Sequence, residues 1–467
     1  MKYVSTRGGI SPTSYEETLF SGYAPDGGLY MPETIPKLAD LTIEQWKLAK
    51  LSYPQVVEKI VRLFVTEEEI TDQELTDAVE RAYEKFNAAE KVGFKDLKSP
   101  NGKSFVLAQL YHGRTVSFKD YALSLAGQFI DHFSKKRKTR TVILVGTSGD
   151  TGSAAMDAVK GLRLVDIVVL YPKGKISQVQ ELQMTSYLDK NIHVYAVEGS
   201  SDDLDVPIKE CFPQHNVTSI NSISWTRVMI QIAHYVYFYL REGNEIDVFV
   251  PTGAAGNITA GIIARLLGIP INLFCATNVN DNVEIFFNSG VYEMGGVVEE
   301  TPANAMDIRY PYNVERIFYL FTDAETTLNI VTKDKSHISA ATKSKISNSV
   351  RGTFKAETSL IYDTLKHTWE LNHFMICPHT ATAVAYYDRC SSSVAKTVYI
   401  IATASPLKFP ESIEKAGISS NLWNAYELRD QLQSTPKIIP EVMRKGTDWR
   451  QTLQAKIDEI LNRSLQE

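Results

Sequence analysis

Cysteines are few in this sequence, and long apolar runs are absent. The 467 residues include four cysteines, and no two of them have the spacing of a metal-binding pair. They are Cys211, Cys275, Cys377 and Cys390. Such a pattern indicates reduced, mostly buried thiols rather than a disulfide framework. No apolar stretch approaches the ~20 residues that span a bilayer, and the N-terminus lacks the apolar core of a signal peptide. We therefore expect a soluble, cytoplasmic protein that does not bind a membrane.

The sequence also lacks an excess of positive charge. Its net charge is −6 and its charged residues make up 22% of the chain, which gives no electrostatic footprint for nucleic acid. The one dense basic run is 135-KKRKTR-140. We interpret this run as the solvated end of a helix, with a phosphate or nucleic-acid contact as the alternative.

The N-terminal region predicts a mostly helical lobe of ~90 residues. Apolar residues recur with helical period at 43–51 and 75–86. Residues 21–37 are rich in proline and glycine and predict a loop. The pair Asn101-Gly102, which lies between two strand-like segments, predicts a hairpin turn.

From residue 141 the chain alternates apolar runs, glycine-containing loops and helical segments. Residues 141–146 and the start of 246–278 have the continuous apolar character of buried parallel strands. Two more buried strands are predicted at 374–378 and 397–404. This order predicts an α/β fold with mostly parallel sheets, whose ligands bind at the carboxyl ends of the strands.

The loop 252-TGAAGN-257 lies between a predicted strand and a predicted helix. Its glycines allow the backbone to approach an anion, and the first amides of the helix point toward that anion. The glycine spacing is neither that of a dinucleotide fold nor that of a Walker loop. A small phosphate monoester, such as that of pyridoxal phosphate, fits this loop; the alternative is a plain strand-to-helix turn.

A second loop, 147-TSGDTG-152, offers hydroxyl groups and backbone amides at a helix start. Donors in that number suit the carboxylate of an amino acid. The alternative is an ordinary N-cap by Asp150 or Thr151.

Lys119 follows Phe118 and precedes Asp120 in the segment 112-HGRTVSFKDYALS-124. A lysine amine attacks aldehydes when desolvation or a nearby cation lowers its pKa. The alternative is a surface lysine paired with Asp120. The presence of two anion-binding loops in the same chain favours the chemical interpretation.

These segments resemble a known family. The motifs that carry the resemblance, in chain order, are YVSTRGG, LFSGYAPDGGLYMPE, HGRTVSFKD, VGTSGDTGSAA, VPTGAAGN, MDIRYPYNVERI and ATASPLKFPE. They are similar to the pyridoxal-phosphate enzymes of the threonine synthase family, and the resemblance runs from residue 3 to about residue 415. It implies fold type II, the tryptophan synthase beta-like architecture, with open, mostly parallel sheets in two lobes and a helical N-terminal lobe.

We predict four consecutive parts on this basis. They are an N-terminal helical lobe at 1–95, a lobe with the cofactor lysine and the substrate-carboxylate loop at 96–240, a phosphate-binding lobe at 241–430, and a helical tail at 431–467.

The resemblance also implies roles for individual residues. Lys119 forms the Schiff base with pyridoxal phosphate and moves protons on the substrate. Asp150 lies near the cofactor ring oxygen, and Thr403 faces the pyridine nitrogen. The cofactor phosphate binds to Gly253, Ala254, Ala255, Gly256 and Asn257. The substrate carboxylate binds to Ser148, Gly149 and Thr151.

A phosphate leaving group needs cations around it. We predict that Arg309 and Lys408 bind the substrate phosphate, with Arg7 and Arg114 as further candidates, because guanidinium groups bind phosphate through two nitrogens. Salt bridges are the alternative for each of them. We assign no chemistry to His379.

The resemblance implies a small phosphorylated amino acid as substrate. The motifs are most similar to the threonine synthase-like 2 branch, which implies a phospho-lyase that converts O-phosphohomoserine or O-phosphothreonine to 2-oxobutyrate, ammonia and phosphate. Ala254-Ala255 replaces the Asn-Phe that microbial synthases typically have. A true threonine synthase is the first alternative, and an inactive family member that acts as a binding or secreted factor is the second. We expect a monomer or a homodimer.

Overall fold

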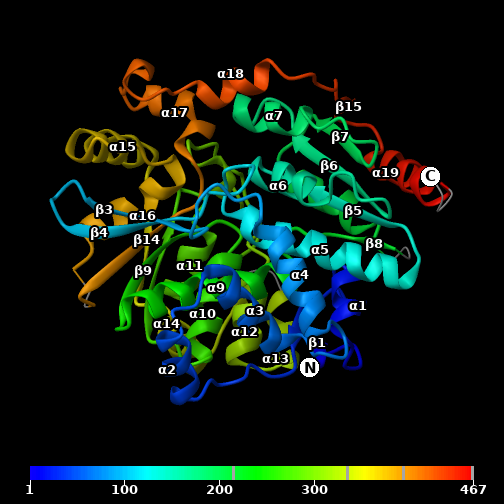
Figure 1. Cartoon of the computed structure of the whole chain (residues 1–467), viewed down its shortest axis with the longest axis horizontal. Helices are drawn as coiled ribbons and strands as arrows, with labels where there is room; N and C mark the ends of the chain where they lie inside the picture. The colour runs from blue at the N-terminus through cyan, green and yellow to red at the C-terminus, as the bar shows by residue number, and fades with distance from the viewer. Residues whose placement is uncertain (213–215, 333–335, 392–394, 464–467) are drawn as a thin grey trace.

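Two open sheets form the frame of the molecule (Figure 1). The structure is a computed structural model that describes residues 1–212, 216–332, 336–391 and 395–463. The five-stranded sheet has the order β15 (Glu441–Met443), β7 (Ile192–Val197), β6 (Val165–Pro172), β5 (Thr141–Gly146) and β8 (Val217–Thr218). The six-stranded sheet has the order β13 (Gly352–Lys355), β10 (Ile271–Thr277), β9 (Ile246–Pro251), β14 (Thr397–Ala402), β4 (Ser104–Gln109) and β3 (Gly93–Lys98). Apart from the antiparallel β3–β4 pair, the neighbouring strands of both sheets run parallel, so the predicted α/β class is confirmed.

Parallel strands that are covered on both faces need apolar side chains at every position. All residues of β6 and β9 are buried, and most of them are apolar. The exceptions are Asp166 of β6, which pairs with Arg140, and Asp247 of β9, which accepts a hydrogen bond from Asn272. In the six-stranded sheet, Phe249 of β9 lies opposite Phe274 of β10, and their rings stack with centroids 4.3 Å apart.

Helices cover both sheets (Figure 1). Those that frame the cavity described below are α5 (Lys119–Arg137), α6 (Asp150–Val159), α9 (Trp225–Glu242), α10 (Gly256–Leu266) and α16 (Pro378–Arg389). The other helices after residue 119 are α7 (Gln178–Thr185), α8 (Asp205–Lys209), α11 (Asn282–Ser289), α12 (Val314–Phe321), α13 (Ala324–Val331), α14 (Ala340–Ser347), α15 (Thr358–Asn372), α17 (Pro410–Lys415), α18 (Glu427–Gln433) and α19 (Trp449–Leu461). Short 3-10 helices lie at Asp202–Leu204, Asn304–Met306, Pro406–Lys408 and Ser420–Leu422. A separate two-stranded sheet is formed by β11 (Val291–Tyr292) and β12 (Ser336–His337), which pair antiparallel although α12 and α13 lie between them in the chain.

The N-terminal region contains helices, two short strands and long connecting segments. Its helices are α1 (Tyr15–Phe20), α2 (Asp40–Leu48), α3 (Tyr53–Phe64) and α4 (Asp72–Tyr83). The prediction that 21–37 is entirely loop is wrong, because β2 (Tyr30–Pro32) pairs antiparallel with β1 (Tyr3–Ser5). A three-residue strand has too few positions to show an apolar alternation.

Sheet membership does not follow the chain order. The predicted hairpin at Asn101-Gly102 is confirmed, but its strands β3 and β4 belong to the six-stranded sheet with β9 and β14. The C-terminal segment adds β15 to the other sheet, and its last residues, 464–467, lie outside the described part of the chain. The boundaries at 95, 240 and 430 therefore divide the chain but do not separate the sheets.

The strand predicted at 374–378 is wrong. Residues 374–377 have no regular structure, and Pro378 begins α16 after Cys377, whose sulfur accepts a hydrogen bond from the amide of Thr380. The strand predicted at 397–404 is confirmed as β14.

Three other expectations concern surface and compartment. The basic run lies at the end of α5, where Arg137 pairs with Glu16 and Glu17. The four cysteines are buried and form no disulfide. No described helix has the length and apolar composition that crossing a membrane requires.

We expect Phe249→Ala to destabilise the six-stranded sheet, because it removes a fully buried ring that stacks on Phe274. The free energy of unfolding should fall by about 3–5 kcal/mol, as measured by chemical denaturation. Leu422→Ala is the control, because Leu422 is 60% exposed and its loss should change stability little. Equal losses in the two variants would contradict this account of the core.

Candidate active site

The carboxyl ends of three parallel strands meet at one cavity. The loop after β5 contributes Ser148, Asp150 and Thr151, the loop after β9 contributes residues 253–257, and Thr403 follows β14. Lys119 lines the same cavity from the start of α5. The predicted position of the ligand site, at the carboxyl ends of the strands, agrees with this geometry.

The segment before Lys119 is fastened to the end of β14. The amide of Phe118 donates to the carbonyl of Thr403 at 2.8 Å, and the amide of Ser405 donates to the carbonyl of Val116 at 2.9 Å. Val116 has φ +52°, a conformation that β-branched residues rarely adopt. Strain of this kind persists only where surrounding contacts impose it, so the position of Lys119 is tightly constrained.

Lys119 is not a surface lysine paired with Asp120. Its amine contacts Asp150 Oδ2 at 3.0 Å, and its side chain is 12% exposed. Asp120 instead accepts hydrogen bonds from the amide and the hydroxyl of Thr115. Burial lowers the pKa of the Lys119 amine, although the carboxylate of Asp150 acts in the opposite direction. The lowered pKa favours the neutral amine, the form that acts as a nucleophile, more than in water.

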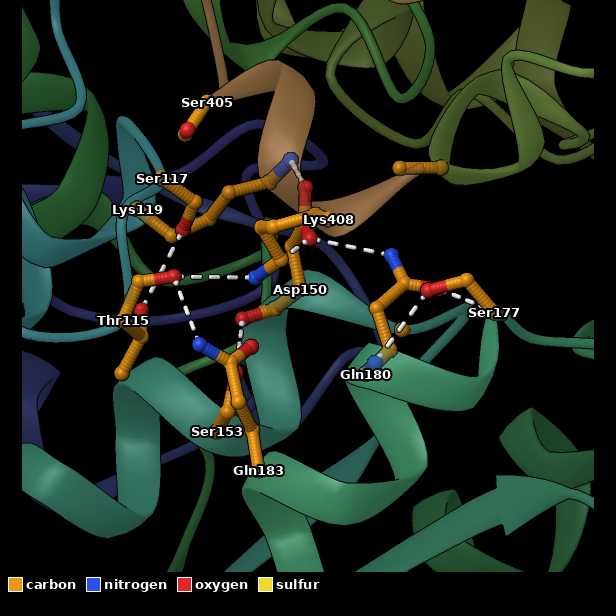
Figure 2. Close-up of polar contacts among 12 residues, drawn as sticks. Thr115, Ser117, Lys119, Asp150, Ser153, Ser177, Gln180, Gln183, Ser405 and Lys408 are labelled. Atoms are coloured by element: carbon orange, nitrogen blue, oxygen red, sulfur yellow. Dashed lines mark hydrogen bonds and ion pairs between the residues drawn. The ribbon is translucent and has the colours of Figure 1, made fainter. Parts of the chain in front are cut away.

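Asp150 holds two ammonium groups at once (Figure 2). Its Oδ2 faces Lys119, and its Oδ1 lies 2.9 Å from Lys408 Nζ and accepts a hydrogen bond from Gln180 Nε2 at 3.0 Å. Burial acts to raise the pKa of the Asp150 carboxyl, but Lys119 and Lys408 outweigh it and hold that pKa well below its usual range. Asp150 is therefore a permanent carboxylate.

The loop 147–152 does not use Asp150 or Thr151 as a helix cap. Thr147 Oγ1 accepts hydrogen bonds from the amides of Gly149 and Gly152, each at 3.0 Å. Ser148 and Thr151 line the cavity, whereas Gly149 is not among the lining residues and lies against Gln180. The hydroxyl groups of Ser148 and Thr151 are thus placed to meet a ligand.

All five residues from Gly253 to Asn257 line the cavity. Ala255 has φ +60°, which turns the chain sharply into α10. The first amides of a helix have no partner within the helix and favour an anion. Asn257 Oδ1 contacts His234 and Tyr235, each at 2.9 Å, and its Nδ2 has no hydrogen-bond partner in the described part of the chain. The loop is therefore an anion cradle, in which backbone amides and Asn257 Nδ2 are available as hydrogen-bond donors.

Arg227 is a cavity residue that sequence reasoning missed. It is 5% exposed on α9, its Nη1 donates to the carbonyl of Ile220, and its Nε has no partner among the described residues. Burial lowers its pKa to about 10, so it remains a cation at neutral pH. The sequence does contain a signal for Arg227, because it lies in a mostly apolar and aromatic helix. A charged group buried in such a helix requires a polar partner or a ligand.

The arginines and the lysine predicted to bind a substrate phosphate do not line this cavity. Arg309 Nη1 contacts Asp281, and its other guanidinium nitrogens contact backbone carbonyls of neighbouring loops. Lys408 is fully buried on Asp150. Arg7 pairs with Glu315, and Arg114 pairs with Asp157. In this structure each of these four residues therefore forms a salt bridge, which was the alternative interpretation of the sequence.

His379 lies against the cavity as a neutral side chain. Its Nε2 accepts a hydrogen bond from the amide of Ala305 at 3.0 Å, and burial lowers its pKa to about 3. Because Nε2 is an acceptor, the ring proton is on Nδ1. Among the described residues, no group of three or more His, Cys, Asp or Glu side chains is arranged to hold a metal ion.

The outer rim of the cavity is acidic. Asp205 accepts a hydrogen bond from the hydroxyl of Tyr312 at 3.0 Å, and Asp202 accepts one from the amide of Arg309. Burial raises the pKa of Asp202 to about 6 and that of Asp205 to about 7. The carboxyl groups of Asp202 and Asp205 are therefore partly protonated near neutral pH.

Solved structures define the class first. The fold matches the crystal structure of threonine synthase from yeast with a TM-score of 0.88 at 30% identity, over 98% of each chain. The structure of PLP-bound threonine synthase from Brucella melitensis matches with a TM-score of 0.87 at 29% identity, over 99% of this chain and 100% of that one. The molecule therefore has fold type II, as the motifs predicted.

Sequence comparisons define the family. The family described as Threonine synthase N terminus matches residues 2–83. Threonine synthase-like 2 of Mus musculus is 40% identical, over 99% of this chain and 98% of the mouse protein. Threonine synthase of Schizosaccharomyces pombe is 33% identical, over 91% of each chain. The chain belongs to the threonine synthase family.

We expect Gly149→Ala to disturb the carboxylate loop. Gly149 has φ +134°, and an added Cβ would overlap the side-chain amide of Gln180, which contacts Asp150. Gly102→Ala is the matched control, because Gly102 also has a positive φ but has open space at the Cβ position. Chemical denaturation should show a loss of about 1–2 kcal/mol for the control and a larger loss for Gly149→Ala. Equal losses would contradict the contact with Gln180.

Proposed function

We propose that the protein is a pyridoxal-phosphate-dependent phospho-lyase. Its substrate is O-phosphohomoserine or O-phosphothreonine, and its products are 2-oxobutyrate, ammonia and phosphate. One observation carries the proposal. A nearly buried lysine amine, paired with a permanent carboxylate, lines a cavity that also contains an anion cradle and Arg227, whose Nε has no partner among the described residues.

The cavity residues fit pyridoxal phosphate. Lys119 would hold its aldehyde carbon, and the cradle at 253–257 would hold its phosphate through backbone amides and Asn257 Nδ2. When bound, this cofactor withdraws electrons from the substrate α-carbon and so allows its proton to leave. The Brucella melitensis structure, which has PLP bound, supports the assignment at 29% identity.

Thr403 would lie at the pyridine nitrogen and Asp150 near the ring oxygen. Thr403 is 5% exposed in the cavity wall. A neutral hydroxyl does not hold the ring nitrogen protonated as an aspartate would, which suits elimination and replacement at the β and γ carbons.

The substrate would be held at both of its anionic ends. The hydroxyl groups of Ser148 and Thr151, with the backbone near Gly149, would bind its carboxylate. Arg227 takes the place of Arg309 and Lys408 as the residue proposed for its phosphate, because the Nε of Arg227 has no partner in the described residues and its side chain lines the cavity. Lys119 would then move protons at the α and β carbons.

The lyase outcome is favoured by the likeness to the threonine synthase-like 2 proteins, and Ala254-Ala255 is part of that likeness. A true threonine synthase is the second candidate, favoured by the relatives and structures of that name. The two outcomes share phosphate release and differ in whether water adds to the substrate. Lys119 and the two anion-binding loops argue against a binding protein without activity. That interpretation would be favoured if the purified protein showed no absorbance band of bound pyridoxal phosphate.

We expect purified protein, supplied with pyridoxal phosphate and either substrate, to release equal amounts of phosphate and 2-oxobutyrate. Phosphate, 2-oxobutyrate and threonine should be quantified in the same reaction. Threonine as the dominant product would identify a synthase instead. Lys119→Ala should abolish turnover. Lys103→Ala should not, because Lys103 donates to the carbonyls of Tyr387 and Cys390 and does not line the cavity.

Arg227→Gln should lower kcat/KM for a phosphorylated substrate by roughly 10- to 100-fold, the loss that one charge-assisted hydrogen bond represents. Arg114→Gln is the control, because Arg114 pairs with Asp157 and does not line the cavity. Steady-state kinetics and inhibition by inorganic phosphate measure the effect. A larger loss for Arg114→Gln than for Arg227→Gln would place the phosphate elsewhere.

A further inference from the structure

We propose that Lys408 is a positioning residue, the fixed counter-ion of Asp150 that leaves Lys119 free to give up its proton. This inference rests on the proposed function, in which Lys119 must act as a neutral amine. Lys119, Asp150 and Lys408 come from three separate segments and meet at one carboxylate (Figure 2).

Lys408 has no route to a substrate. It is fully buried, its ammonium contacts Asp150 Oδ1 at 2.9 Å and the carbonyl of Thr115 at 3.0 Å, and it does not line the cavity. Burying an ammonium group costs several kcal/mol unless a charged partner is held in good geometry. Among the described residues, Asp150 is the only carboxylate within ion-pair distance of Lys408. We therefore expect Lys408 to act through Asp150.

The two oxygens of Asp150 have different partners. Oδ1 accepts from Lys408 and from Gln180 Nε2, and Gln180 Oε1 in turn accepts from Asn304 Nδ2 at 2.8 Å. Oδ2 is left to face Lys119 at 3.0 Å. The contacts on Oδ1 therefore fix the carboxylate plane, while the contact on Oδ2 is the one that changes when Lys119 changes its charge.

Charge balance gives Lys408 its effect. With Lys408 present, the buried cluster is neutral when Lys119 is neutral, and it carries an extra positive charge when Lys119 is protonated. With Lys408 absent, the neutral cluster is the one in which Lys119 is protonated and paired with Asp150. Because a low-dielectric interior disfavours net charge, Lys408 shifts Lys119 toward the free amine and keeps Asp150 a carboxylate in both states.

The other groups around Lys119 do not reverse this balance. Each packed element contributes one of them: Asp120 on α5, Asp150 on α6, Arg227 on α9, His379 on α16 and Lys408 after β14. Arg227 adds positive charge and acts in the same direction as Lys408. The neutral imidazole of His379 adds no charge. Burial raises the pKa of Asp120 to about 6, and its carboxyl group accepts hydrogen bonds from Thr115 and interacts with Lys408, whereas the charges that act most on Lys119 are those of Asp150, Lys408 and Arg227.

The test reads the amine directly, without turnover. Cofactor-free full-length protein is treated with formaldehyde and cyanoborohydride at a series of pH values, and modification of Lys119 is followed by peptide mass spectrometry. We expect the midpoint of the rate profile to move to higher pH in Lys408→Met and to stay near that of the unmodified sequence in Lys408→Arg, which keeps the charge. Turnover by Lys408→Met should fall roughly 10- to 100-fold, the range for residues that orient a catalytic group.

A second variant covers the case in which Lys408→Met does not fold. Asp150→Asn combined with Lys408→Met removes both buried charges, so its Lys119 midpoint should lie at or below that of the unmodified sequence. Lys103→Met, the same change outside the cavity, should not move the midpoint. An unmoved midpoint in folded Lys408→Met, or a raised midpoint in the double variant, would overturn the inference. Failure of the proposed function would appear separately, as absence of phosphate release by the unmodified sequence.

Discussion

One buried carboxylate, that of Asp150, is the interaction on which the site depends. A carboxylate that has lost its water needs cations and hydrogen-bond donors in its place. Lys119, Lys408 and Gln180 supply them from three segments far apart in the chain. Folding must bring the start of α5, the start of α6 and the segment after β14 to the same point. The site is therefore complete only when all three segments are in place.

The backbone around the cavity is strained where it supports this cluster. Val116, just before Lys119, and Ala255, in the anion cradle, both have positive φ angles. Such conformations are costly for residues other than glycine. At Val116 the cost is offset by hydrogen bonds that join Val116 to Ser405 and Phe118 to Thr403, just after β14. The end of the six-stranded sheet thereby fixes the position of Lys119.

Much of the fold and part of the site could be predicted from the sequence, and particular residues show where prediction stopped. The glycine loops at 147–152 and 252–257 were recognisable as candidate anion sites because they lie between a predicted strand and a predicted helix, although a plain turn or an N-cap has the same local pattern. Residues 374–378 were assigned wrongly to a strand, because a short apolar run does not distinguish a strand from the approach to a helix. The partner of Lys408 is Asp150, which lies far from it in the chain, so no local pattern contains that contact. Arg227 stands in a mostly apolar helix, but the sequence does not show that this side of the helix lines the cavity.

The choice between lyase and synthase does not lie with Lys119. In both proposed outcomes this amine would remove protons before phosphate leaves, so the same Asp150 cluster would serve both. What differs is the delivery of water to the substrate, and that depends on the cavity wall. The cavity residues that have a buried polar atom without a protein partner in the described residues are Gln231, Asn221, Asn257, Arg227 and His379, and such atoms are able to hold a water. Gln231 and Asn221 have been given no ligand above, and Ala254 and Ala255 line the same cavity. The difference between the two proposed outcomes is therefore to be sought in the cavity wall rather than at the amine.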